Sequence, residues 1–310
     1  MTFLTGLLNS LPSAISQGLI WGIMAIGVYV TYKILDVADL TVDGSLCTGG
    51  AMCVILLVNG KPMWLALICA ILVGMASGLL TGLFITKFGI PAILAGILTQ
   101  LALYSINLHI MGWGTSSLSK SNLPVSVDKY NLLVSSRYVR ELSFRNPIIV
   151  VIIFVAITIA VLYWFFGTEL GCSIRATGAN VSMARAQGVN TDKTKVIGLV
   201  ISNGLVTLSG ALLAQYQGFA DINMGRGAIV IGLAAVIIGE VIFDKIFKNF
   251  ALKLLACVFG AIIYYTVIQF VLKLGLSTDD LKLLTAFVVA IFLAIPYWNG
   301  KFRKGGNKHA

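Results

Sequence analysis

Long apolar runs alternate with short polar breaks along the whole chain. We identify about nine candidate membrane-spanning segments bounded by charged residues, glycine or proline. They fall near residues 13–32, 44–58, 62–86, 90–111, 147–167, 196–218, 227–243, 250–272 and 282–299. Most could cross a hydrocarbon core of about 30 Å as a helix, whereas the second and seventh are short and rich in glycine. The pattern predicts an all-α, polytopic membrane protein that includes short or re-entrant segments.

Composition supports this prediction. Hydrophobic residues make up 58% of the chain and charged residues only 11%, where soluble domains are about a quarter charged. The net charge of +10 is better explained by basic loops at the membrane surface than by nucleic-acid binding. The first basic residue is Lys33, so the N-terminus lacks the positive region of a signal peptide and we interpret it as mature chain. The five cysteines show no metal-ligand or disulfide spacing and are interpreted as packing residues.

The distribution of Lys and Arg favours one orientation. If the tail at 300–310 is cytoplasmic, alternation also places Lys33, Lys87 and the polar insert at 168–195 in the cytoplasm. The N-terminus and the loop at 112–146 then lie outside. That loop does not follow the tendency of basic residues to lie in cytoplasmic loops. It carries Lys120, Lys129, Arg137, Arg140 and Arg145. Its mixture of aromatic and basic residues fits either a docking surface or a solvated loop.

An aspartate-containing motif occurs twice. "DLTVDGS" at 39–45 follows the first span and "DINMGRG" at 221–227 follows the sixth, so the two copies lie five spans apart and have opposite orientations. This arrangement is typical of inverted repeats, whose interrupted helices flank a substrate path. We therefore expect one transmembrane domain, 1–310, with a first repeat near 13–111 and a second near 196–299. Chance recurrence of short Asp/Gly turns is the alternative.

The polar insert contains the signals of a short helix. Asn180 suits an N-cap, residues 181–187 ("VSMARAQ") are good helix formers, and Gly188 suits a left-handed C-cap. A helix of about two turns is marginal in water, so it needs something to pack against. On the cytoplasmic side this is expected to be a second protein; the alternative is a solvated basic loop.

Three segments in order carry a family resemblance. They are "YKILDVADLTVDGS", "IRATGANVSMARAQGVNTDK" followed by "VIGLVISNGLVTLSGALLA", and "MGRGAIVIGLAAVIIGE". Together they resemble permease subunits of branched-chain amino-acid and ribose-type ABC importers. "DLTVDGS" is most similar to a subgroup associated with aromatic amino acids and similar small solutes. One departure is Glu240, which follows Gly239 where those relatives often carry paired glycines.

The resemblance implies a homodimer in the bacterial cytoplasmic membrane, with an ATPase subunit docked under each copy and an extracytoplasmic binding lipoprotein. The matching positions of the cytoplasmic coupling loop are Gly171, Arg175, Ala176, Gly178, Asn180, Ala184, Gly188 and Asn190, and we include Arg185 among the predicted coupling residues. No G-x-x-x-x-G-K-[ST] motif occurs, so ATP is expected to bind a partner chain. No cofactor, metal site or catalytic residue is predicted, and the chain is not expected to be an enzyme.

Polar residues inside the spans are candidates for the path. Burying a carboxylate in a membrane costs about 2.5 to 3.5 kcal/mol, so Asp36, Asp39 and Asp43 are expected either to cap helices at the interface or to be paired and functional. Asp43 is predicted to accept backbone N–H bonds from the short helix that follows it. The pathway candidates are Asp43, Gln100, Tyr104, Asn107, Asn203 and Thr207. Helix-to-helix hydrogen bonding is the alternative for Gln100, Tyr104, Asn107, Asn203 and Thr207.

Two further patterns concern packing and charge. Gly74, Gly78 and Gly82 form a small-residue stripe that lets another helix approach closely, within the subunit or across a dimer. Glu240 and Asp244 are expected to pair with Lys245 and Lys248. The family resemblance implies an importer subunit that moves a small solute, including an amino acid, by alternating access. The rivals are an ion-coupled secondary transporter and a membrane scaffold that transports nothing.

Overall fold

A computed structural model describes residues 2–114, 118–126, 129–130, 132–139, 146–244 and 246–273, with isolated positions 283, 286–287, 289–291 and 294. Six helices of this part are long and apolar enough to span a membrane. They are α1 (Thr2–Tyr29), α3 (Met63–Thr86), α4 (Ala92–Gly112), α5 (Pro147–Gly167), α8 (Thr191–Gln217) and α10 (Phe250–Lys273). Two apolar helices, α2 (Val42–Val58) and α9 (Ala228–Phe243), are shorter.

The all-α, polytopic class is therefore confirmed, and the first eight predicted spans each coincide with a helix. The count of about nine is not confirmed, because the span predicted at 282–299 lies largely outside the described residues. The segment between α1 and α2 is irregular. A π-helical turn, η1 (Val30–Ile34), ends the first span, and Asp36 then has a φ of 55°.

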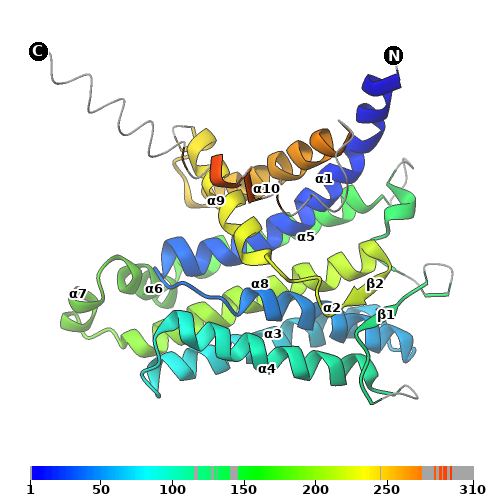
Figure 1. Ribbon diagram of the computed structural model, residues 1–310. Helices are drawn as coiled ribbons and strands as arrows, with labels where there is room; N and C mark the ends of the chain where they lie inside the picture. Colours follow the sequence, from blue (N-terminus) through cyan, green and yellow to red (C-terminus); the bar gives the residue numbers. More distant parts are fainter. Residues whose placement is uncertain are drawn as a thin grey trace, which may run out of the picture.

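The long helices form a layered bundle around α1 and α8, the two most buried spans. In Figure 1, α8 runs through the middle of the molecule, with α3 and α4 on one side and α1 and α10 on the other. α8 packs against α1, α2 and α3, whereas α9 packs against α1 and α10. The two short helices therefore belong to opposite sides of the bundle, and they meet near its middle.

The two ends of the bundle carry different elements (Figure 1). At one end the polar insert forms α6 (Glu169–Ala179) and α7 (Val181–Ala186). At the other, β1 (Asn122–Pro124) pairs antiparallel with β2 (Phe219–Asp221), Leu123 opposite Ala220. A 3-10 turn, η2 (Ser136–Tyr138), lies in the loop that contains β1. This loop is thus joined by backbone hydrogen bonds to the chain that follows α8.

The small-residue stripe of α3 packs within the subunit. Gly74 faces the Thr207 side chain, Gly78 faces the Leu199 carbonyl and Gly82 faces Val196, all on α8. A side chain on α3 at these positions would hold the two helix backbones apart. The alternative of a stripe directed across a dimer is therefore not needed to explain it.

We expect Gly78→Ala to destabilise the fold more than Gly82→Ala. The Cβ atom added at Gly78 would overlap the carbonyl oxygen of Leu199, whereas one at Gly82 would lie 3.1 Å from the Val196 Cα atom. Overpacking a close helix contact costs about 1 to 3 kcal/mol, and both variants gain the same helix propensity. Thermal denaturation in detergent should give a lower melting temperature for Gly78→Ala. Equal melting temperatures would contradict this packing.

Candidate transport pocket and coupling surface

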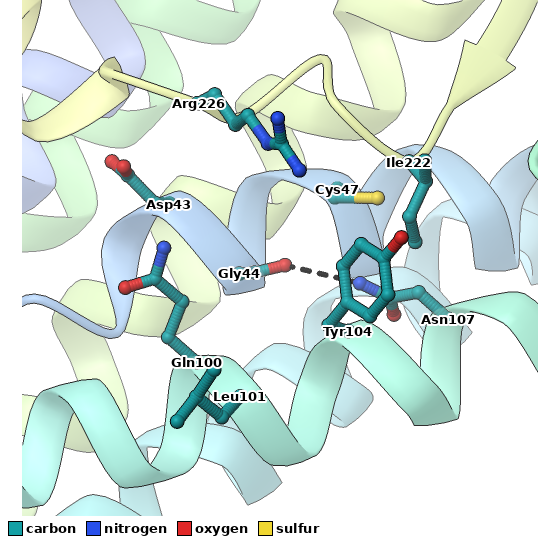
Figure 2. Close-up of a pocket in the computed structure, with 9 residues that line it drawn as sticks. All are labelled: Asp43, Gly44, Cys47, Gln100, Leu101, Tyr104, Asn107, Ile222 and Arg226. Atoms are coloured by element: carbon teal, nitrogen blue, oxygen red, sulfur yellow. Dashed lines mark hydrogen bonds between the residues drawn. The ribbon is translucent and has the colours of Figure 1, made fainter.

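A cavity of about 160 Å³ lies between α2, α4 and the segment that joins β2 to α9. Figure 2 shows side chains from all three elements around it. The residues that line it are Asp43, Gly44, Cys47, Gln100, Leu101, Tyr104, Asn107, Ile222 and Arg226. Residues 100–107 occupy the middle of a 21-residue helix that is long enough to cross a bilayer. The cavity therefore lies near the middle of the span, and it brings together four of the six predicted pathway residues.

The polar face of α4 points toward α2 and the cavity. Tyr104 is 44% exposed and Gln100 is half-buried, and neither side chain has a hydrogen-bond partner among the described residues. Asn107 is buried. Its Nδ2 donates to the Gly44 carbonyl at 3.4 Å (Figure 2), but its Oδ1 has no partner in the described part of the chain. Polar groups without partners at membrane depth indicate a wet or ligand-binding cavity.

Asp43 caps the short helix of the other half of the molecule. Its Oδ2 accepts from the backbone N–H of Gly227 at 3.0 Å and its Oδ1 from that of Ile229 at 2.9 Å. Asp43 was predicted to accept hydrogen bonds from the short helix that follows it, α2, and this partner was wrong. Asp43 lies inside the first turn of α2 and accepts from α9 instead. Gly227 has no side chain to cap α9, and its φ of 85° favours glycine. The α2 carboxylate fills that role.

The two aspartate motifs therefore meet at the cavity. Asp43 comes from the first motif, and Gly225, Arg226 and Gly227 come from the second. A Cβ atom at Gly225 would overlap the carbonyl oxygen of Asp43, so this contact requires glycine. The inverted repeat itself stays a prediction, but the segments that suggested it are in contact.

Sequence reasoning missed Arg226. Its exposed side chain reaches from the β2–α9 segment into the cavity (Figure 2). Among the residues described here its guanidinium has no hydrogen-bond or ion-pair partner. The signal was a single arginine in a glycine turn between two apolar segments, "NMGRGAIV".

Asn203 and Thr207 lie elsewhere. Both are fully buried in α8. Asn203 Nδ2 donates to Asp39 Oδ2 at 2.8 Å, and its Oδ1 accepts from Ser45 at 2.6 Å. Thr207 donates to carbonyls of its own helix and packs on Gly74. Neither residue lines the cavity. For Asn203 the structure supports the alternative, hydrogen bonding between helices. Asp39 Oδ1 also accepts from the Thr41 N–H at 2.9 Å, a local turn contact just before α2 begins.

The polar insert contains two helices, and the longer one was not predicted. α6 begins after Thr168, whose hydroxyl accepts from the Gly171 N–H, and it has Glu169 in its first turn. Ile174 and Thr177 are buried. The Thr177 hydroxyl is 2.8 Å from that of Thr194, which hydrogen-bonds α6 to α8. The N-cap and the apolar spacing were visible in the sequence.

Close backbone contacts seat α6 on the bundle. A Cβ atom at Gly178 would overlap the Ile34 carbonyl oxygen, and one at Gly171 would overlap the end of α5 at Phe165. Ala176 is half-buried on the same helix. These contacts explain why small residues occur at the predicted coupling positions.

Arg175 holds α6 against two further helices. Its guanidinium donates to the Phe166 carbonyl and lies 4.6 Å from the centre of the Phe250 ring and 5.5 Å from that of the Phe166 ring. Such cation–π contacts are worth about 0.5 to 2 kcal/mol each. α6 is therefore anchored to the end of α5 and the start of α10.

The predicted caps of α7 are present in the structure. Asn180 Oδ1 accepts from the Met183 N–H at 2.9 Å, Gly188 has a φ of 82°, and Asn190 caps α8 through the Lys193 N–H at 3.1 Å. Ala184 is buried. Arg185 donates to Thr191 at 2.8 Å and to Asp192 at 3.5 Å, so the predicted basic side chain is bound to the start of α8.

Glu240 pairs with a residue that the sequence did not suggest. Its Oε2 is 3.1 Å from Lys33 Nζ, an ion pair between α9 and η1. Glu240 is therefore paired as expected, but its partner is Lys33 and not Lys248, because the fold brings the end of the first span beside the end of α9. Lys245 lies outside the described residues.

The apolar spans define a polytopic helical membrane protein. Two short helices meet at a cavity lined by polar side chains without partners, and a helix pair is anchored at one end of the bundle. These features are those of the transporter class. A comparison with protein families identifies which one. The family described as "Branched-chain amino acid transport system / permease component" matches residues 10–295, and the chain belongs to it. It is a multi-pass protein of the bacterial cytoplasmic membrane and a transport subunit, not an enzyme.

Individual relatives agree with the family. The chain is 40% identical over 301 residues to the tyrosine transport system permease protein of Clostridioides difficile (strain R20291), covering 97% of this chain and 96% of the relative. It is 35% identical to an uncharacterized protein of Rickettsia prowazekii (strain Madrid E), covering 93% and 98%. It is 25% identical to the ribose import permease protein of Escherichia coli (strain K12), covering 75% and 69%. The resemblance drawn from the sequence motifs is confirmed.

Proposed function

We propose that the chain is the transmembrane subunit of an ABC importer, in which a separate ATPase docks on α6 and α7 and a binding protein delivers a small solute at the opposite end. Two copies of the chain form the transport path, and the cavity beside Asp43 is a solute-binding site along that path. Membership of a permease family supports the transport role. The partner chains and the dimer are part of the proposal.

The observation that carries this proposal is the seating of α6. It contacts the end of the first span through Gly178, α8 through Thr177, and α5 and α10 through Arg175. A force applied to α6 would therefore reach four helices of the bundle at once. The short, capped α7 beside it has Met183 exposed on the protein surface, where the ATPase can dock.

Alternating access requires the ATPase to favour one state of the permease. A partner with equal affinity for two states shifts nothing. We infer that nucleotide-driven closure of two ATPase subunits moves the α6–α7 pairs, and that α1 and α10 pass the movement to α9, against which both pack. α9 begins at the cavity, so its displacement changes access to the solute.

An amino acid is the favoured solute. The relative that matches at 40% identity is named for tyrosine transport, and the family description names branched-chain amino acids. A relative at 25% identity is named for ribose, so a sugar is the second candidate. We propose amino-acid import, with an aromatic amino acid as the first to be tried.

The test uses liposomes that contain the permease and its ATPase, with the binding protein outside and ATP inside. Uptake should require ATP and should continue when ionophores dissipate the ion gradients. We expect Arg175→Ala to lower ATP-driven uptake at least tenfold, because the loss of one charge-assisted hydrogen bond and two cation–π contacts releases α6 at a cost of about 2 to 5 kcal/mol. Lys61→Ala, which removes an exposed charge between α2 and α3, should transport normally.

Each rival predicts a different outcome. Uptake that follows an ion gradient without ATP or an ATPase would indicate a secondary transporter, which membership of this permease family does not favour. The absence of any flux with all partners present would indicate a scaffold. Normal ATP-driven uptake by Arg175→Ala would contradict the role given to α6.

A further inference from the structure

We propose that the cavity binds the zwitterionic head of an amino acid, with Arg226 as the carboxylate-binding residue and Asp43 as the anionic side. This inference rests on the proposed transport function and assigns a recognition site to it. The cavity carries one cationic and one anionic side chain among its lining residues. A free amino acid carries the complementary pair of charges.

The two charges are kept apart. Asp43 is held on α2, with both oxygens engaged by the start of α9, and the Arg226 side chain extends from the neighbouring β2–α9 segment away from that carboxylate (Figure 2). No ion pair joins them in this part of the chain. An arginine and an aspartate that line one cavity would normally neutralise each other. Because backbone N–H groups fix the carboxylate, the guanidinium is left available to a ligand.

Arginine suits the carboxylate. Its planar guanidinium presents a fork of donors that binds a carboxylate through two parallel hydrogen bonds. The ammonium group of the ligand can then face Asp43, since each carboxylate oxygen has a second lone pair beyond the one used by α9.

Further groups complete the recognition surface. Gln100 and Tyr104 extend from α4 toward the same space, and neither has a partner among the described residues. The Tyr104 ring and Leu101 are exposed at the rim. A cavity of about 160 Å³ is small, so it holds the polar head while the side chain of the solute extends over this apolar rim. Such a site binds the ammonium and carboxylate groups that all amino acids share. Selection among side chains is then made by the binding protein.

The experiment compares solutes and variants in the liposome system, with the same wild-type binding protein in every arm. Radiolabelled L-tyrosine, a labelled mixture of amino acids and labelled ribose are the probes. We expect Arg226→Ala to lower ATP-driven amino-acid uptake roughly tenfold to a hundredfold, because the variant loses two charge-assisted hydrogen bonds to the carboxylate of the solute. Arg226→Lys should recover part of the uptake, because lysine keeps the charge without the fork. Lys61→Ala removes a charge from an exposed turn outside the cavity and should stay within about twofold of wild type.

A structural role of Arg226 is tested by the melting temperature in detergent. This temperature should be the same for wild type and Arg226→Ala, because the wild-type side chain makes no bond within the described structure. Amino-acid uptake by Arg226→Ala within twofold of wild type would overturn the inference while leaving the transport function intact. Uptake of ribose but not amino acids by the wild type would do the same. No ATP-driven uptake of any probe would remove the transport function itself.

Discussion

Replacing Gly178 by alanine is expected to abolish ATP-driven transport while the chain remains inserted in the membrane. The added Cβ atom would overlap the carbonyl oxygen of Ile34 and crowd the Leu35 Cα atom. Neither backbone atom can move aside as a flexible side chain could. α6 would have to lift away from the end of the first span, and its contacts through Arg175 and Thr177 would be lost with it.

Gly167→Ala is the matched control for this change. Gly167 ends α5, two residues before α6 begins, and a Cβ atom there would meet no atom within 4 Å. Uptake in liposomes and co-purification of the ATPase should both fall at least tenfold for Gly178→Ala and stay near wild type for Gly167→Ala. Full transport by Gly178→Ala would show that α6 does not need its seat on the first span.

The second large effect is expected at Asp43. In Asp43→Asn one of the two oxygens becomes an NH₂ group, which faces a backbone N–H of α9 and cannot accept from it. The start of α9 also loses the negative charge that its dipole favours. Together these changes should cost about 2 to 4 kcal/mol and loosen α9 from α2. We expect a lower melting temperature in detergent and strongly reduced solute uptake.

Asp36→Asn tests whether any loss of negative charge in this region has the same effect. Asp36 is exposed, makes no side-chain bond among the described residues, and has a φ of 55°, which asparagine tolerates well. Its melting temperature should match the wild type. Equal behaviour of the two variants would mean that the contacts to Gly227 and Ile229 contribute little.

Features encoded by local sequence were predictable. Asn180 and Gly188 lie next to the helix that they cap, so their residue types alone located α7. The spans were visible because a helix in lipid needs a continuous apolar run, and the i, i+4, i+7 spacing of Gln100, Tyr104 and Asn107 placed them on one face. Local hydrogen bonds and helical periodicity require no knowledge of the fold.

Partners distant in sequence could not be predicted. Asp43 lies 184 residues from Gly227, and Lys33 lies 207 residues from Glu240. Each charge had a nearer candidate in the sequence. The nearer partner of Glu240 is excluded by the packing of α9 against the first span, and that of Asp43 by its place inside the first turn of α2. Asn203 was predicted to line the path because a buried amide needs partners, but the pattern could not show that Asp39 and Ser45 already supply them. Arg226 was missed because its neighbours are known only after folding.

The cap that joins α2 to α9 also has a consequence for synthesis. The Asp43 carboxylate enters the membrane with the second span, but the N–H groups that satisfy it belong to residues made 184 and 186 positions later. At roughly 5 to 20 residues per second, the ribosome needs on the order of 10 to 40 s to deliver them. During that interval the Asp43 carboxylate lacks its final hydrogen-bond donors, and a carboxylate at membrane depth is costly. Synthesis of the start of α9 is therefore the step at which the first aspartate motif gains its hydrogen-bond partners.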